Sequence, residues 1–287
     1  MSSPSEKTVV LVHGAWVTTR SWDTFRRPFE RAGYRVLTPT WPGLEGLSAA
    51  QVRRHLPVGF GSLSLGRIVD HLEAYIQALP QPPLLVGHSF GGLLVQKLLD
   101  RGCGAAGVAI NPAPIAGIVP GPTTLAAVLP ALARWRGWSR PYAHTRGSFG
   151  RQYANTAPHD LVSRFFNEAV IPTPGRILHQ AATWLGTGID PRRRTQPLLI
   201  TGSEADRLVT PHLSRAAYAI QRRAPGLTDF SFYDGLSHLL IAEPGYERVA
   251  RDVIGWLEAL PTFAGRPLRA SDACPGPGPA ADRRVRV

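Results

Sequence analysis

The stretch Gly87-His88-Ser89-Phe90-Gly91-Gly92 combines a nucleophilic side chain with small neighbours. It follows the apolar run Leu84–Val86 and precedes Leu93–Leu99, which has the periodicity of a helix. The spacing Gly-x-Ser-x-Gly between a strand and a helix is typical of a nucleophile elbow, a turn that needs small residues around the serine. We therefore predict that Ser89 is a nucleophile at a helix N-terminus, where the helix dipole favours developing negative charge.

A serine hydroxyl is a weak nucleophile at neutral pH, so it needs a general base, and the base needs an acid to orient it. Among the nine histidines, His238 is the best placed, because it lies in a short loop after the last predicted strand. Catalytic groups gather in such loops at the carboxyl ends of strands in open α/β sheets. We predict His238 as the base and interpret His13 and His88 as residues constrained by their loops.

The orienting acid is expected on a loop between the nucleophile and the base. The loop 201–211 follows a predicted strand and precedes a predicted helix. Asp206 in this loop is our predicted acid, and Glu204 is its near competitor. Asp234 and Glu243 lie too close in sequence to the predicted base to be preferred.

The chain resembles the α/β-hydrolase superfamily over about residues 8–260. The resemblance is carried by four stretches, which are Leu11-Val12-His13-Gly14-Ala15-Trp16, the elbow, Gly202–Asp206 with Val209 and Pro211, and Ser237-His238. The order Ser…Asp…His is the order of that superfamily. The resemblance implies an oxyanion hole formed by the amides of Phe90 and Ala15, and it implies a reaction without a cofactor.

Departures from relatives of this superfamily narrow the expected chemistry. A serine at position 89 argues against the haloalkane dehalogenases and epoxide hydrolases of this fold, which use a carboxylate nucleophile. Hydroxynitrile lyases need a lysine beside the histidine, whereas the chain has only Lys7 and Lys97. Hydrolysis of esters, lactones, thioesters and carbon–carbon bonds remains open, since one acyl-enzyme mechanism serves them all.

The elements that must position these residues alternate between strand and helix. Strands are predicted at 8–13, 34–39, 84–86, 105–110, 198–201 and 229–233. Helices are predicted at 22–32, 65–79, 211–223 and 246–260 and in the elbow, with Pro28 expected to kink or divide the first. This alternation predicts an α/β fold with a mostly parallel sheet and helices on both faces.

Two segments depart from the alternation within a predicted domain of residues 1–264. Residues 112–195 interrupt the sheet with prolines, glycines and three tryptophans, and we interpret them as a helical cap insertion at the active edge. Residues 43–63 are expected to form a long connection. Residues 265–287 are predicted to be a disordered, basic, Pro/Gly-rich tail, because they cannot bury a core.

The net charge of +12 is concentrated in two places. Residues 112–195 hold ten Arg against three acidic residues, and the tail holds five Arg against two. This basic cap suggests an acidic carrier protein as a possible partner, while no pattern typical of nucleic-acid binding is present. No apolar run is long enough to span a bilayer and no signal region is visible, so we expect no membrane partner and a cytoplasmic location.

These observations predict a serine hydrolase, most simply a carboxylic ester hydrolase, acting on a small apolar substrate. No cluster with metal-ligand spacing and no phosphate-cradling glycine loop is present, so neither a metal nor a cofactor is expected. The first alternative is a thioesterase acting on acyl groups carried by coenzyme A or by a carrier protein. The second is a ligand-binding receptor that retains the hydrolase pocket. The sequence specifies neither the natural substrate nor the oligomeric state.

Overall fold

A single sheet of six parallel strands organises the molecule. The structure is a computed structural model, and it describes residues 7–261. From one edge to the other, the strands are β2 (Arg35–Leu37), β1 (Thr8–Val12), β3 (Leu84–His88), β4 (Ala106–Ile110), β5 (Leu198–Ser203) and β6 (Thr228–Tyr233). Each neighbouring pair runs parallel. Because β1, β3, β4 and β5 are buried almost throughout, their apolar runs fit a sheet that is covered on both faces.

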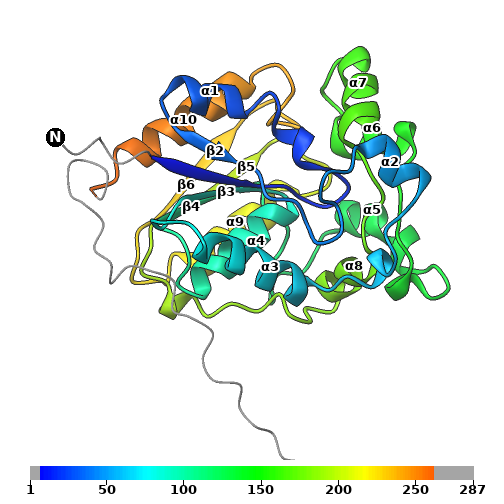
Figure 1. The fold of residues 1–287 in the computed structure, drawn as a ribbon, viewed down its shortest axis with the longest axis horizontal. Helices are drawn as coiled ribbons and strands as arrows, with labels where there is room; N and C mark the ends of the chain where they lie inside the picture. The colour runs from blue at the N-terminus through cyan, green and yellow to red at the C-terminus, as the bar shows by residue number, and fades with distance from the viewer. Residues whose placement is uncertain (1–6, 262–287) are drawn as a thin grey trace, which may run out of the picture.

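Helices cover the two faces of this sheet (Figure 1). One face carries α1 (Arg26–Arg31) and α10 (Tyr246–Glu258), which pack against each other. The other face carries α3 (Leu65–Gln77), α4 (Phe90–Asp100) and α9 (Pro211–Gln221). A separate buried apolar cluster lies on each side of the strands. The predicted α/β class, with a parallel sheet between two helical layers, is confirmed.

Two segments differ in detail from the predicted elements. The helix expected at 22–32 is divided into a 3-10 turn, η1 (Thr19–Trp22), and α1, whose first turn contains Pro28. A proline is tolerated in the first turn, because its missing N–H would have no partner within the helix there. The connection expected at 43–63 contains α2 (Ala49–Arg54), which Ser48 and Gln51 cap reciprocally, and a second 3-10 turn, η2 (Phe60–Ser62).

The predicted insertion at 112–195 lies within the segment that joins β4 to β5. This segment contains α5 (Pro122–Leu132), η3 (Gly137–Ser139), α6 (Arg146–Tyr153), α7 (His159–Ala169), α8 (Gly175–Ala182) and η4 (Pro191–Arg193). Figure 1 shows α5, α6, α7 and α8 together at one end of the sheet, at the right of the view. The predicted tail at 265–287 lies outside the described residues.

The insertion has two nested parts. An antiparallel bridge between Tyr142 and Thr173 closes a base, from which residues 142–173 project with α6 and α7. We call residues 142–173 the inner arm. We call residues 113–141 and 174–189, which carry α5, η3 and α8, the outer arm. Helix α6 packs on α7, whereas α5 packs on α8 and η3.

Candidate active site

Ser89 lies in a strained turn between β3 and α4. Its backbone angles are φ 58° and ψ −121°, which a non-glycine residue seldom adopts. The turn is held from both sides, since the Ser89 amide donates to Ile110 (2.9 Å) and the Ser89 carbonyl accepts from Ala113 (2.9 Å). Backbone strain of this kind persists only where the surroundings enforce it, and it is concentrated at functional sites.

Glycines on both sides of Ser89 permit this turn. A Cβ on Gly87 would collide with the carbonyl of Gly91, and a Cβ on Gly91 would collide with the carbonyl of Val12. The elbow is therefore packed backbone to backbone, both within itself and against the end of β1. This explains in steric terms the small residues that the motif requires at these two positions.

His238 and Asp206 meet at the carboxyl ends of β5 and β6. The Nδ1 of His238 lies 2.6 Å from Oδ2 of Asp206, and both side chains are fully buried. Because a carboxylate only accepts hydrogen bonds, Nδ1 carries the proton. The neutral imidazole then has a lone pair on Nε2, which is buried and has no hydrogen-bond partner within residues 7–261. An imidazole in this state can accept a proton at Nε2.

Four donors surround the Asp206 carboxylate. Oδ1 accepts from the amides of Leu208 (2.8 Å) and Val209 (2.7 Å). Oδ2 accepts from Nδ2 of Asn111 (2.8 Å) as well as from His238. This arrangement fixes the carboxylate in one orientation.

The competitor Glu204 occupies a different environment. Its side chain is exposed and accepts from the Gly235 amide (3.0 Å). Since Glu204 makes no contact with the His238 imidazole that we find between residues 7 and 261, the structure brings Asp206 and not Glu204 to the histidine.

His88 links the elbow to the His238 loop. Its Nε2 donates to the backbone carbonyl of His238 (2.8 Å), which leaves Nδ1 to accept from the Tyr153 hydroxyl (3.4 Å). Burial, together with the nearby His238, lowers the pKa of His88 well below its ordinary value. Burial raises the pKa of Tyr153, and the charge of Asp206 adds to this effect. Both side chains therefore stay neutral and connect the elbow, the His238 loop and the inner arm.

The first loop after β1 lies directly against the elbow. A Cβ on Gly14 would sit 2.8 Å from the His88 carbonyl and 3.3 Å from the Phe90 amide nitrogen. Among residues 7–261, we find no acceptor for the amides of Ala15 or Phe90. Two unpaired amides beside Ser89 have the chemistry of an anion-binding site for a developing oxyanion.

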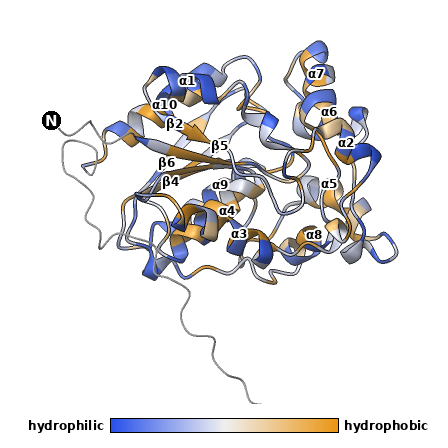
Figure 2. Cartoon of the chain, in the orientation of Figure 1, coloured by the Kyte–Doolittle hydropathy of each residue, from blue (hydrophilic) through white to orange (hydrophobic). Residues whose placement is uncertain are grey.

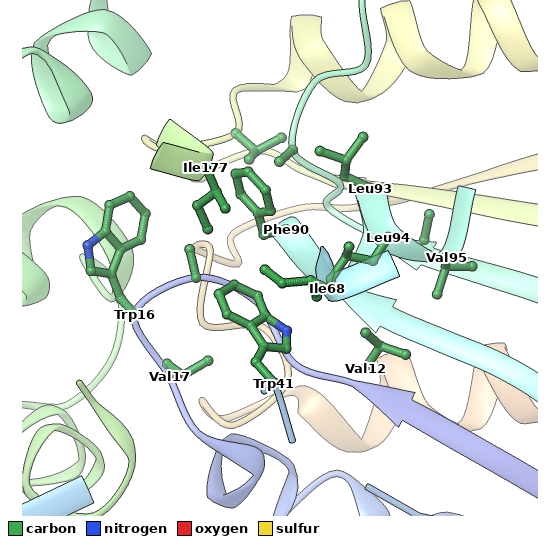
Figure 3. Close-up of a cluster of buried hydrophobic side chains, with 14 of the residues drawn as sticks. Val12, Trp16, Val17, Trp41, Ile68, Phe90, Leu93, Leu94, Val95 and Ile177 are labelled. Atoms are coloured by element: carbon green, nitrogen blue, oxygen red, sulfur yellow. The ribbon is translucent and has the colours of Figure 1, made fainter. Parts of the chain in front are cut away.

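A small apolar pocket opens over Ser89. Its volume is about 110 Å³, and it is lined by Trp16, Ser89, Phe90, Ala113, Pro114, Pro120, Thr124, Leu125, Val128, Leu178, Ala181, Ala182, Leu208 and Val209. The outer arm contributes most of this wall. Figure 3 shows Trp16, Trp41 and Ile177 gathered near Phe90 at the start of α4. A site of this size and lining favours a compact apolar group.

The inner arm is hydrogen-bonded to all three loops that carry the predicted catalytic residues. Tyr153 bonds to His88 beside Ser89, and Nδ2 of Asn155 donates to the carbonyl of Ala205 (3.0 Å), just before Asp206. Thr156 donates to Oε2 of the buried Glu243 (2.5 Å). Oε1 of Glu243 in turn accepts from the amide of Ser237 (2.6 Å), which precedes His238.

Sequence reasoning missed several residues of this site. Asn111 follows β4 at the edge where the other residues gather, so the rule of strand carboxyl ends was a usable signal for it. Tyr153, Asn155 and Thr156 carried no such signal, because an insertion's contacts depend on how it folds back. Glu243 was set aside as an orienting acid, and in the structure it holds Ser237 rather than the imidazole.

A six-stranded parallel sheet with these three loops at its carboxyl edge defines the fold of a hydrolase. A profile of the alpha/beta hydrolase family matches residues 9–253. The chain belongs to this family, as the resemblance predicted.

A match to an individual protein covers part of the chain. The chain is 35% identical over 92 residues to a carbendazim-hydrolysing esterase of Nocardioides sp. (strain SG-4G). That match spans 32% of this chain and 35% of the esterase, about a third of each.

Solved structures share the fold over nearly the whole chain. A monoacylglycerol lipase of Paleococcus ferrophilus is 20% identical, with a TM-score of 0.64 over 90% of this chain and 96% of its own. A pyrethroid hydrolase of Sphingobium faniae JZ-2 is 15% identical, with a TM-score of 0.60 over 89% and 98%. A thioesterase domain from the curacin biosynthetic pathway is 20% identical, with a TM-score of 0.58 over 89% and 93%. At these identities, the likeness concerns the fold.

Proposed function

We propose that the protein is a serine hydrolase that cleaves an ester bond in a compact, apolar substrate without a cofactor. The observation that carries this proposal is the His238 imidazole, whose Nδ1 is bonded to the buried Asp206 and whose Nε2 is unpaired. The strained Ser89 and the apolar pocket above it support the same conclusion. The partial match to an esterase supports the choice of an ester bond.

The proposed reaction begins with attack by Ser89 Oγ on the substrate carbonyl carbon. His238 Nε2 takes the hydroxyl proton, and the resulting imidazolium is stabilised by Asp206. The amides of Ala15 and Phe90 hold the oxyanion. His238 then gives the proton to the departing alkoxide, which leaves an acyl group on Ser89. A water molecule, deprotonated by the same Nε2, releases the acid and restores the serine.

The proposed reaction requires Ser89 Oγ and His238 Nε2 to come into hydrogen-bond contact. No hydrogen bond joins Ser89 to His238 in the part of the chain that the structure describes. Such catalytic bonds are often long in the free enzyme and tighten when substrate is bound. We propose that the helical insertion acts as a cap that excludes water once an acyl group fills the pocket, since the outer arm supplies most of its lining.

Covalent labelling with a fluorophosphonate tests the nucleophile, and turnover of p-nitrophenyl esters tests the reaction. Label is expected on Ser89, and Ser89→Ala should reduce kcat by about 10⁴-fold or more. Asp206→Asn should cost about 10⁴-fold through the wrong imidazole tautomer. Glu204→Gln is the matched control and should keep near-normal activity. Label on another serine would contradict the proposal.

A thioesterase is the second candidate, and one surface feature favours it. An open groove of about 460 Å³ beside the Asp206 loop is lined by Arg146, Arg151, His159 and Arg207 among other residues. These guanidinium groups form no ion pair that we find within residues 7–261, so the groove suits an anionic carrier group. A coenzyme A thioester and a neutral ester with the same acyl group separate the candidates. Stoichiometric binding of both without turnover would instead favour a receptor.

A further inference from the structure

The outer arm has an exposed apolar face. Eleven large hydrophobic side chains are exposed within residues 7–261, and seven of them belong to this arm. These seven, which we call the apolar face, are Val119, Leu125, Leu129, Trp135, Trp138, Trp184 and Leu185. Trp135 is 77% exposed, which is extreme for a tryptophan. A concentration of exposed apolar side chains on one part of a surface marks a site of interaction.

The members of the apolar face lie on elements that pack against one another. Helix α5 contacts α8 and η3, and η3 contacts α8. Leu125 and Leu129 are four residues apart and so share one side of α5. At one end of the arm, the indole nitrogen of Trp184 donates to the carbonyl of Ile118 (3.3 Å), next to Val119. Figure 2 shows apolar residues along both α5 and α8 at this end of the molecule.

The charge on the outer arm has one sign. Its charged residues are Arg134, Arg136, Arg140 and Arg176, and its sequence contains neither Asp nor Glu. The first three are exposed and alternate with Trp135 and Trp138. None of these arginines is paired with an acidic side chain that the structure describes. The apolar face is therefore bordered by unpaired cations, which complement an anionic partner.

We propose that the apolar face docks the protein on an anionic lipid surface. Tryptophan suits the boundary between water and hydrocarbon, because its ring is apolar and its N–H is polar. Arginines beside it are attracted to anionic headgroups. The combination of exposed tryptophans with an acid-free basic border is the composition of an interfacial segment.

The position of the pocket favours a lipid surface over a protein partner. Leu125 belongs to the apolar face and also lines the pocket above Ser89. A protein seated on this face would cover that side of the pocket. A lipid surface would instead present apolar molecules to it directly. The docking inference goes beyond the proposed function, and lipid binding can be measured without any catalytic turnover.

Docking on a surface does not require a segment that crosses the bilayer. Between residues 7 and 261, no helix is long and apolar enough to cross a membrane. The expectation of no membrane partner rested on the absence of a spanning segment. The proposal replaces that expectation with peripheral contact through exposed side chains, which a search for spanning segments does not detect.

Co-sedimentation of the full chain with vesicles tests this inference. One set of vesicles contains phosphatidylglycerol and phosphatidylcholine in equal parts, and the other contains phosphatidylcholine alone. We expect stronger binding to the anionic vesicles, with a decrease as salt is added. The double variant Trp135→Ser, Trp138→Ser and the triple variant Arg134→Gln, Arg136→Gln, Arg140→Gln should each weaken binding by about ten-fold or more.

The matched control substitutions are at exposed residues outside the insertion, far from the apolar face in sequence. Leu227→Ser removes an exposed leucine outside the insertion, and the pair Arg222→Gln, Arg223→Gln removes two exposed cations after α9. These controls should bind as the wild type does. Every variant retains residues 265–287 with their five Arg, so the tail cannot account for a difference between variants.

Three outcomes would overturn the inference. The first is wild-type protein that binds neither set of vesicles, or that binds both equally. The second is binding that survives both sets of substitutions on the outer arm. The third is a change of oligomeric state in the tryptophan variant, measured by sedimentation velocity, without vesicle binding. That result would assign the apolar face to a second copy of the chain.

Discussion

The two arms of the insertion meet the rest of the molecule in different ways. The inner arm is hydrogen-bonded to the elbow, to the Asp206 loop and, through Glu243, to the His238 loop. The outer arm touches the site mainly through apolar packing, and the one hydrogen bond to those loops that we find within residues 7–261 comes from its first residue, where the Ala113 amide donates to the Ser89 carbonyl (2.9 Å). It also carries the exposed apolar side chains, of which the inner arm has none among those found exposed.

This difference separates two tasks within one insertion. Hydrogen bonds fix direction and distance, so the inner arm can hold catalytic groups in position. Apolar packing tolerates a change of side chain as long as volume is kept, so the outer arm can change with the substrate. The following predictions test whether the two arms respond differently to substitution and to pH.

Protonation of His144 in the inner arm should lower the stability of the protein at acid pH. This side chain is buried beside Trp16, with ring centroids 4.8 Å apart, and burial lowers its pKa from 6.5 to about 4. Between pH 6.5 and 4, the unfolded chain binds a proton that native His144 does not. As far as His144 is concerned, the free energy of unfolding therefore has its full value above pH 6.5. It decreases by about 3 kcal/mol as the pH falls toward 4.

Chemical denaturation of the wild type and of His144→Gln, each at pH 7 and pH 4, measures this effect. The variant should lose less free energy of unfolding between the two pH values, whatever its stability at pH 7. His159→Gln, at an exposed position of the same arm, should keep the wild-type difference. If all three proteins lost the same free energy of unfolding between pH 7 and pH 4, His144 would not be responsible for the loss.

Removing two hydroxyl groups from the inner arm should reduce the rate of the proposed reaction. The double variant Tyr153→Phe, Thr156→Val keeps the shape of both side chains but breaks the links to His88 and Glu243. We expect kcat per labelled active site to fall by about 10²-fold with KM nearly unchanged, because a shift of about 1 Å in catalytic groups has an effect of that size.

Two further variants separate positioning from general damage. The single variant Thr156→Ser retains the hydroxyl group and should keep most of the wild-type kcat. Tyr142→Phe removes a hydroxyl of the same arm for which we find no partner in residues 7–261, and it should have no effect. A double variant that turns over within two-fold of the wild type per labelled site would show that the inner arm does not position these loops.

A substitution in the outer arm should change selectivity rather than chemistry. Leu125 lines the pocket, so Leu125→Ala enlarges it. The ratio of kcat/KM for a long acyl ester to that for a short one should rise by up to about ten-fold. Leu129→Ala, one turn along the same helix and outside the pocket lining, should leave the ratio unchanged. An equal reduction of kcat for both esters in Leu125→Ala would contradict the prediction that the outer arm affects selectivity alone.

The sequence was sufficient to predict the sheet and to place Ser89, Asp206 and His238 at its carboxyl edge, although Asn111 at the same edge was missed. Buried parallel strands appear as short apolar runs, and a polar residue just after such a run is easily recognised, as for Ser89 and Asp206. Helix α2 was missed although Ser48 and Gln51 have the spacing of a capping box. The helix expected at 22–32 is divided, as the presence of Pro28 suggested, but Pro28 itself lies in the first turn of α1 and not at the break.

The organisation of the insertion could not be predicted in the same way. The bridge between Tyr142 and Thr173, which defines the two arms, joins residues that no local pattern connects. The contacts of Asn155 and Thr156 depend on the path of α6 and α7 over the sheet edge. Local sequence patterns therefore predict the loops that carry Ser89, Asp206 and His238, but they do not predict how the inner arm contacts these loops.

The links made by the inner arm have a consequence for the time at which the protein becomes active during synthesis. They join residues that are 65, 50 and 87 positions apart, and the last of them ends at Glu243. A ribosome releases Ser89 and the inner arm well before it releases β6 and the loop that follows. Contacts over such separations form late, because the intervening chain must first be ordered. A nascent chain that ends before His238 lacks the proposed base of Ser89, and one that ends before Glu243 lacks the last of these links. Under the proposed mechanism, full hydrolytic activity therefore begins only when translation of the domain is nearly complete.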